Sequence, residues 1–174
     1  MTTLQCICGQ TTITVSGPPI MAVDCCCTSC RTAALRLQTL PGVTALLGPH
    51  AETRYILYRK DRVALPPPDR LRSFRLTPQS KTRRVLAACC NAPLFLEFTG
   101  GHWLSLYATL WPAGTAPPAD LRSMTSDLPD PSVLPDDIPN ARTQNARFML
   151  GLLTAWIAMG FRIPKIATGE DIDA

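Results

Sequence analysis

The chain has 174 residues, of which 46% are hydrophobic and 17% are charged. This balance indicates a folded globular protein and excludes a disordered one. The net charge of +4 is modest and does not by itself indicate a nucleic-acid partner. The first residues hold no basic segment followed by an apolar run. We therefore expect no secretory signal, a cytoplasmic location, and cysteines that are reduced rather than paired as disulfides.

The first predicted strand follows a pair of cysteines. Cys6 and Cys8 precede Gly9, and this Cys-x-Cys-Gly pattern is typical of a metal knuckle, because glycine lets the backbone turn tightly around an ion. The β-branched run Thr11–Val15 then predicts a strand.

Four closely spaced cysteines come next, and three of them, Cys25, Cys27 and Cys30, form the pattern C-x-C-x-x-C. A tight turn can aim these three sulfurs at one zinc ion, which binds thiolates tetrahedrally. Three protein ligands leave one position open, which indicates a reactive site rather than a purely structural one. Buried or disulfide-bonded cysteines are the alternative. We expect Asp24 to cap the turn or to orient a ligand, and Ala33–Thr39 to form a short strand.

Basic residues dominate the middle of the chain. Ten Lys and Arg residues lie between Arg54 and Arg84, against only Asp61 and Asp69. They form either a surface for an anionic ligand or a solvated strand face. Few aromatic residues accompany them, so we do not expect nucleic acid as a partner.

Short strands separated by turns fill this middle region. Pro66–Pro68 cannot join a strand ladder and predicts a loop. Alternating apolar residues predict four strands: Arg54–Tyr58, Leu71–Leu76, Leu94–Phe98 and Trp103–Leu110. The sequence thus predicts a mainly β domain over residues 1–111.

Residues 112–140 hold seven prolines and five aspartates, and we expect an extended surface segment with neither strand nor helix. Residues 141–174 should form a helix over Ala141–Phe161, followed by a loose acidic tail from Thr168. The apolar part of the helix is too short for a membrane span, and we do not expect a membrane partner. Its large apolar residues should pack on the β domain or pair two copies as a homodimer: Phe148, Met149, Leu152, Leu153 and Trp156.

Taken together, the order of the cysteine motifs, ending with Cys89 and Cys90 just before Pro93-Leu94, resembles the family of glutathione-dependent formaldehyde-activating enzyme and centromere protein V. The resemblance covers about residues 4–111. It implies a β-tent of small antiparallel sheets pinned by zinc, with one structural and one catalytic zinc ion. It also implies carbon–sulfur lyase chemistry on an adduct of glutathione and formaldehyde.

The resemblance also assigns residues. It implies that Cys25, Cys27 and Cys30 are the catalytic ligands, and Arg31 follows them as a candidate for binding substrate. Cys6 and Cys8 match half of the structural site. The other half of that site is altered, because one family cysteine falls on Ala87. Cys90 keeps its place and Cys89 is the candidate replacement, so we expect one or two zinc ions per chain.

We therefore expect a zinc-dependent, lyase-like enzyme that acts on a thiol adduct of a small aldehyde. Three thiolates make the metal a weak Lewis acid, so a substrate thiol is a better fourth ligand than a hydrolytic water. Arg83 or Arg84 are further candidates for holding a substrate carboxylate, and His50 and His102 for acid–base roles. Cys26, Thr32 and Leu35 replace residues typical of the family, which leaves the substrate open. The alternative is a non-catalytic zinc module that binds a partner through the basic strands or the C-terminal helix.

Overall fold

Two β-sheets carry the fold in the computed structural model, which describes residues 1–173. Within these residues, the larger sheet has eight strands in the order β10-β3-β4-β9-β8-β7-β6-β11, and the smaller has the order β1-β2-β5. Their bounds are β1 Thr2–Gln5, β2 Thr12–Val15, β3 Met21–Cys25, β4 Thr53–Arg59, β5 Val63–Ala64, β6 Leu71–Phe74, β7 Thr82–Ala87, β8 Pro93–Phe98, β9 Trp103–Tyr107, β10 Leu121–Ser123 and β11 Asp171–Ile172. The prediction of a mainly β chain with a C-terminal helix is confirmed.

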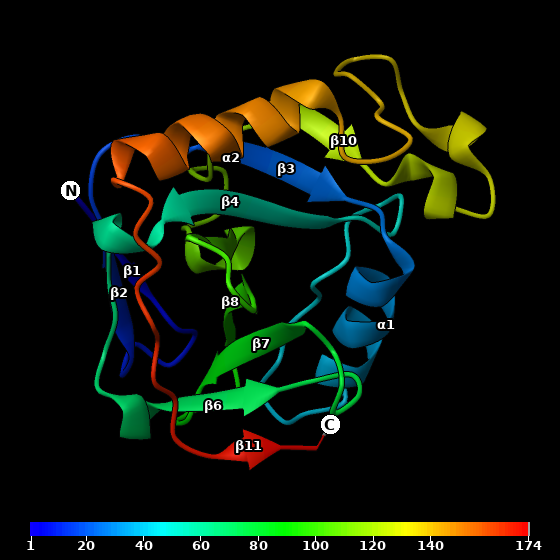
Figure 1. Ribbon diagram of the computed structural model, residues 1–174. Helices are drawn as coiled ribbons and strands as arrows, with labels where there is room; N and C mark the ends of the chain where they lie inside the picture. Colours follow the sequence, from blue (N-terminus) through cyan, green and yellow to red (C-terminus); the bar gives the residue numbers. More distant parts are fainter. Residues whose placement is uncertain (174) are drawn as a thin grey trace.

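The larger sheet is strongly bent. Its inner strands pair antiparallel, whereas β10 joins β3 and β11 joins β6 in parallel at the two edges. In Figure 1, β3 and β4 lie far from β6, β7 and β11, and helix α1 (Thr28–Leu37) lies beside the space between them. The bend gives the sheet a concave face, and the candidate site is on that face.

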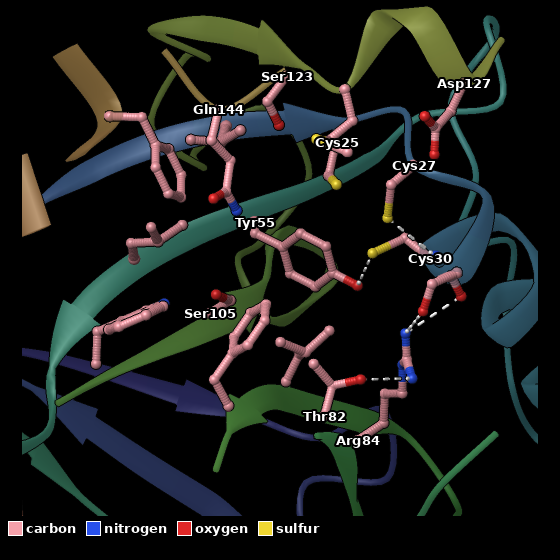
Figure 2. A pocket seen from close by; sticks show the side chains of 18 residues that line it. Cys25, Cys27, Cys30, Tyr55, Thr82, Arg84, Ser105, Ser123, Asp127 and Gln144 are labelled. Carbon is pink, nitrogen blue, oxygen red and sulfur yellow. Dashed lines mark hydrogen bonds between the residues drawn. The ribbon is translucent and has the colours of Figure 1, made fainter. Parts of the chain in front are cut away.

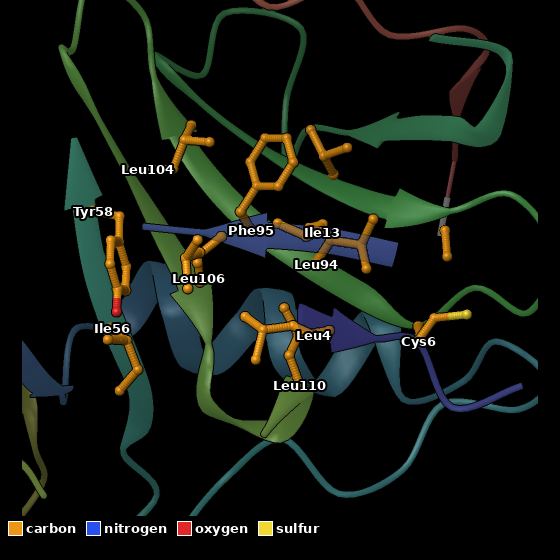
Figure 3. Packing of buried hydrophobic residues seen from close by; sticks show 14 of the residues in the cluster. Leu4, Cys6, Ile13, Ile56, Tyr58, Leu94, Phe95, Leu104, Leu106 and Leu110 are labelled. Atoms are coloured by element: carbon orange, nitrogen blue, oxygen red, sulfur yellow. The ribbon is translucent and has the colours of Figure 1, made fainter. Parts of the chain in front are cut away.

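One hydrophobic cluster lies between the two sheets. Leu4 and Ile13 of the small sheet pack against Ile56, Phe95 and Leu106 of the large sheet, as Figure 3 shows. Apolar side chains alternate along these strands, because successive residues of a strand point to opposite faces. This cluster fixes the small sheet on the face of the large sheet that is away from the site.

A second cluster fills the other face, where helix α2 (Ala146–Ala158) lies across β3 and β4 (Figure 1). The side chain of Asn145 caps the helix by accepting a hydrogen bond from the amide of Phe148, at 2.9 Å. Phe148 and Leu152 are buried as predicted, whereas Met149 and Leu153 are about half exposed. The expectation of a C-terminal helix is confirmed with tighter bounds. None of the helices within residues 1–173 has the length and apolar character that crossing a bilayer requires.

The segment after the central cysteines is a helix, and the predicted strand over Ala33–Thr39 is wrong. Helix α1 covers most of it, and its buried residues Ala33, Ala34 and Leu37 have the spacing of one helix face. Alanine, leucine and arginine also have high intrinsic helix propensity. The apolar residues of this segment repeat with the period of a helix, but the segment is too short for the sequence alone to show that period.

The Pro/Asp-rich segment is more ordered than the sequence suggested. Within residues 112–140, which we expected to hold neither strand nor helix, β10 pairs in parallel with β3. The tail is not loose either, because β11 joins β6 and Ser73 hydrogen-bonds Asp171. Short 3₁₀ helices occupy several connections: Lys60–Arg62, Pro68–Arg70, Ala108–Leu110, Thr125–Asp127 and Pro131–Val133.

Candidate metal centre

The junction between β3 and α1 brings three cysteines together. Cys25 is the last residue of β3, Cys27 caps the N-terminus of α1, and Cys30 lies in its first turn. The Cys27 sulfur accepts a hydrogen bond from the Cys30 amide at 3.3 Å, so the cap itself aims that sulfur at the helix end. The three Sγ atoms lie within 4.8 Å of one another. The sequence predicted this convergence, and the structure places all three residues in one group.

The fourth cysteine of the cluster faces away. Cys26 is fully buried beside Leu128 and Leu134, on the opposite side of the strand end from its two neighbours. Burial raises the pKa of its thiol to about 11, with smaller contributions from Glu52 and Asp24. Cys26 therefore stays protonated and packs as a small apolar residue.

A second group joins the two other cysteine pairs, which are about eighty residues apart in the sequence. Cys8 Sγ lies 3.3 Å from Cys89 Sγ and 3.5 Å from Cys6 Sγ. The sulfur of Cys90 completes a set of four within 4.8 Å. Ala87, where the resembled family has a cysteine, is fully buried in the core between the sheets. Cys89, and not Ala87, therefore stands in the outer group.

The turn between β7 and β8 makes this arrangement possible. Asn91 has φ of 58°, a left-handed conformation that asparagine tolerates better than most residues. The turn closes with a hydrogen bond from the Asn91 amide to the Ala87 carbonyl, at 2.9 Å. Adjacent residues Cys89 and Cys90 can therefore both approach Cys6 and Cys8.

Both groups have the chemistry of a metal site. All eight cysteines are free thiols, and sulfur ligands suit zinc and other soft metal ions. In the second group, hydrogen bonds from the Thr11 amide and from the other three thiols outweigh burial and lower the pKa of Cys6 to about 6. A thiol that ionises near neutral pH is ready to bind a cation.

Only the first group borders a large cavity, of about 350 Å³. Its walls come from β3, β4, β7, β8, β9, β10 with the residues that follow it, the start of α1, and α2 with the segment that leads into it (Figure 2). Seven of the 18 lining side chains are large and apolar: Val23, Leu57, Leu96, Phe98, Trp103, Met124 and Phe148. The outer group does not line this cavity. The central group, with three thiols beside a cavity, thus has room for a further ligand, whereas the outer group already has four thiols.

A buried arginine stands beside the central cysteines. Arg84 is fully buried, and its Nη2 donates to the hydroxyl and carbonyl oxygens of Ser29 at 3.1 and 3.2 Å. Its Nε has no hydrogen-bond partner, and no carboxylate in residues 1–173 forms an ion pair with it. A buried charge without a counter-charge is strongly destabilising. The thiolates of the central group are the nearby negative charges that can balance it.

The protonation of the central thiols supports this pairing. Hydrogen bonds from Cys25 and Cys27 hold the pKa of Cys30 well below its usual range, and the charge of Arg84 and the Tyr55 hydroxyl add to the effect. The Tyr55 hydroxyl donates to the Cys30 sulfur at 3.7 Å (Figure 2). Burial keeps the pKa of Tyr55 itself well above its usual range. The charge of Arg84 and the Tyr55 hydroxyl thus favour an ionised Cys30, and Tyr55 remains a neutral donor.

Several residues singled out in the sequence lie elsewhere. Arg31 does not line the cavity, because its guanidinium turns to the Asp127 carbonyl at 2.8 Å. Asp24 does not cap the turn but binds Arg54 through two bonds of 2.7 and 2.8 Å. His102 packs under α2 with Nε2 2.8 Å from the Leu152 carbonyl. His50 lies in a separate turn, closed by Glu52.

Tyr55, which the sequence did not single out, contacts the site because its strand faces the cysteine cluster.

Ion pairs engage half of the ten basic residues in the middle of the chain: Arg54, Arg59, Lys60, Arg72 and Arg83. Lys60 and Arg83 both bind Glu97, and Arg72 pairs with Glu170. Pairs that are distant in sequence are invisible to a count of charges along the chain. The strands therefore present less free positive charge than a count along the sequence suggests.

Comparison with known proteins does not extend the assignment. No protein-family model matches the sequence, and no curated protein matches it. The site must therefore be interpreted from its own geometry.

Proposed function

We propose that the protein is a zinc-dependent enzyme of the carbon–sulfur lyase type, acting on the adduct of a thiol and an aldehyde. One observation carries the proposal: three thiols converge on the wall of a cavity large enough for a small molecule. Three sulfur ligands leave one zinc position for a substrate, and the cavity offers a place for its body. This reaction class is also the one expected from the resembled family.

The side chains around the cysteines suit the reaction. Arg84 supplies a fixed positive charge beside Cys30, and Tyr55 donates to the same sulfur. Both favour the ionised form of the ligand set. A zinc ion bound there would supply a position at which a substrate thiol loses its proton. Addition of that sulfur to an aldehyde forms one C–S bond and places a proton on the former carbonyl oxygen. The lyase direction reverses these changes.

Zinc content and exchange kinetics test the proposal together. The zinc content of the wild type and of Cys27→Ala is measured by elemental analysis, and thiol–aldehyde exchange is followed by exchange NMR. We expect Cys27→Ala to lose one zinc ion and the exchange activity while it keeps the fold. Cys26→Ala is the matched control, because the Cys26 thiol faces away from the cavity. This variant should keep both the zinc ion and the exchange activity. Exchange that persists unchanged in Cys27→Ala contradicts the proposal.

A second candidate function is partner binding through α2. Met149, Leu150, Leu153 and Ile157 are each 46–61% exposed, and their spacing places them on one helix face. An apolar face of this kind is typical of a contact with another protein, including a second copy of the chain. Sedimentation of the wild type and of Leu153→Glu tests the homodimer. A monomeric wild type excludes it.

A further inference from the structure

The floor of the cavity contains a hollow that the cysteines do not fill. Leu57 of β4 lies directly opposite Ser105 of β9, and Ser105 lies opposite Leu96 of β8. Residues paired in this way point to the same face of the sheet. The row therefore has a short serine between two leucines, and all three line the cavity. The serine makes room where a larger residue would fill the space.

The charges of the cavity gather at its cysteine end. The ionisable groups that line it, besides the thiols and Tyr55, are Arg84 and Asp127. Arg84 binds Ser29, next to Cys30, and the Asp127 carboxylate accepts from the Thr28 amide at 3.0 Å. Figure 2 shows Ser105 on the other side of the Tyr55 ring from the cysteines. The hollow at Ser105 is thus a neutral arm of the cavity.

Aromatic residues close this arm. The rings of Phe98 and Trp103 pack with centroids 5.5 Å apart, and both line the cavity together with Phe148 from α2. The Ser105 hydroxyl makes no hydrogen bond to another residue of the described chain, although the residue is only 5% exposed. A ligand in the arm would thus meet apolar carbon, the uncommitted Ser105 hydroxyl and the neutral carboxamide of Gln144, which also lines the cavity (Figure 2).

We propose that this arm binds an uncharged hydrocarbon body, so that the substrate is an adduct with an alkyl or phenyl group rather than one of a charged peptide thiol. The proposal names the substrate class of the same site and rests on the proposed function for its thiol end alone. A peptide thiol carries carboxylate and ammonium groups, and burying them in an arm without counter-charges is strongly unfavourable. Each buried methylene, in contrast, strengthens binding about fourfold.

Calorimetric titration of the zinc-loaded protein with ethanethiol, butanethiol, hexanethiol and glutathione tests this assignment. We expect Kd to fall about fourfold for each methylene that enters the arm, and glutathione to bind more weakly than hexanethiol. A Kd that does not depend on chain length, or glutathione as the tighter ligand, overturns the proposal.

Two substitutions at Ser105 locate the binding. Ser105→Leu fills the hollow and should weaken hexanethiol about 15-fold, the value of two methylenes, while ethanethiol and zinc content stay unchanged. Ser105→Ala keeps the space and should retain the dependence on chain length. Hexanethiol binding that is equal in Ser105→Leu and the wild type contradicts the assignment. If Ser105→Leu does not fold, Leu96→Ala lengthens the arm and should extend the gain in affinity to octanethiol; no extension also contradicts it.

Alcohols separate this inference from the proposed function, because they lack the thiol. If 1-hexanol binds more tightly than ethanol by the same factor per methylene but no thiol–aldehyde exchange occurs, the apolar arm is supported and the lyase proposal fails. If exchange occurs with hydrophilic thiols and neither series depends on chain length, the lyase proposal stands and the apolar arm is excluded.

Discussion

The guanidinium of Arg84 holds the first turn of α1 through the hydroxyl and carbonyl of Ser29, at 3.1 and 3.2 Å. Ser29 directly precedes Cys30, so a cation on β7 fixes the helix end that carries a thiol. The strand that bears Arg84 continues into the turn with Cys89 and Cys90. Strand β7 therefore supports both cysteine groups. Its Arg84 places a positive charge beside the central group, and the turn at its end carries two cysteines of the outer group.

Arg84 should control the affinity of the central metal site. Removing its charge in Arg84→Met leaves the thiolates without a counter-charge, and we expect zinc binding to weaken about tenfold or more, the effect of losing one charge-assisted interaction. Competition with a coloured chelator measures this. Arg83→Met is the matched control, because Arg83 binds Glu97 and Ile166 instead. Equal zinc affinity in the two variants contradicts the role of Arg84.

The outer cysteines should contribute to stability rather than to turnover. A metal ion held by Cys6, Cys8, Cys89 and Cys90 would tie the β1–β2 loop to the β7–β8 turn, and binding energy of this kind is folding energy. We expect Cys89→Ala to lose one zinc ion and to unfold at a lower temperature than the wild type. Strong chelators should lower the melting temperature of the wild type towards that of the variant.

Cys90→Ala distinguishes a four-thiol site from one in which only one of the adjacent cysteines binds. Equal losses of zinc in Cys89→Ala and Cys90→Ala indicate that both sulfurs are ligands. Zinc that is retained in either variant shows that the corresponding sulfur is not required.

The central cysteine group could be predicted from the sequence because its three thiols are close together in the chain. The spacing of Cys25, Cys27 and Cys30 lets one turn bring them together, and no distant residue is needed. Whether Cys89 joins Cys90 in the outer group stayed open, because it depends on how the chain turns at Asn91. Composition alone does not specify that turn.

The remaining features of the site depend on contacts between distant strands. Arg84 is one of ten basic residues in its region, and only the register of β7 against β8 places it on the concave face, opposite Leu96. The hollow at Ser105 has the same origin, since it exists only when Leu57 and Leu96 flank it. Helix α1 was missed for another reason. Its buried face consists of Cys30, Ala33, Ala34 and Leu37, which is too few residues to separate a helical period from that of a strand by sequence alone.

His102 should make stability depend on pH. Burial lowers the pKa of His102, the nearby charge of Lys60 adds to this, and the hydrogen bond to the Leu152 carbonyl only partly offsets it. Below about pH 6.5 the unfolded chain therefore binds a proton that the folded chain refuses, and the free energy of unfolding falls until the pH reaches the lower folded pKa. Each unit of difference in pKa corresponds to about 1.4 kcal/mol.

Denaturant unfolding at several pH values between 7 and 5 measures this effect. His102→Gln should show a shallower loss of stability than the wild type over this range, and His50→Gln controls for the loss of a histidine in a turn away from α2. Parallel curves for the wild type and His102→Gln contradict the assignment.

His102 also stacks on Trp156 at 5.6 Å, so acid should loosen α2 before the rest of the fold. Hydrogen exchange of the α2 amides reports that order.

The ion pair of Asp24, next to Cys25 in the sequence, gives a last prediction. Asp24 is 1% exposed and accepts two hydrogen bonds from Arg54, whose side chain is 42% exposed. Arg54→Met leaves a buried carboxylate unpaired, whereas Asp24→Asn leaves a neutral amide beside an arginine that can turn to water. We therefore expect Arg54→Met to cost about 2–3 kcal/mol and Asp24→Asn about 1 kcal/mol of unfolding free energy. The double variant should cost less than the sum, because removing both charges leaves none buried. Strictly additive losses in denaturant unfolding would show that the two side chains act independently.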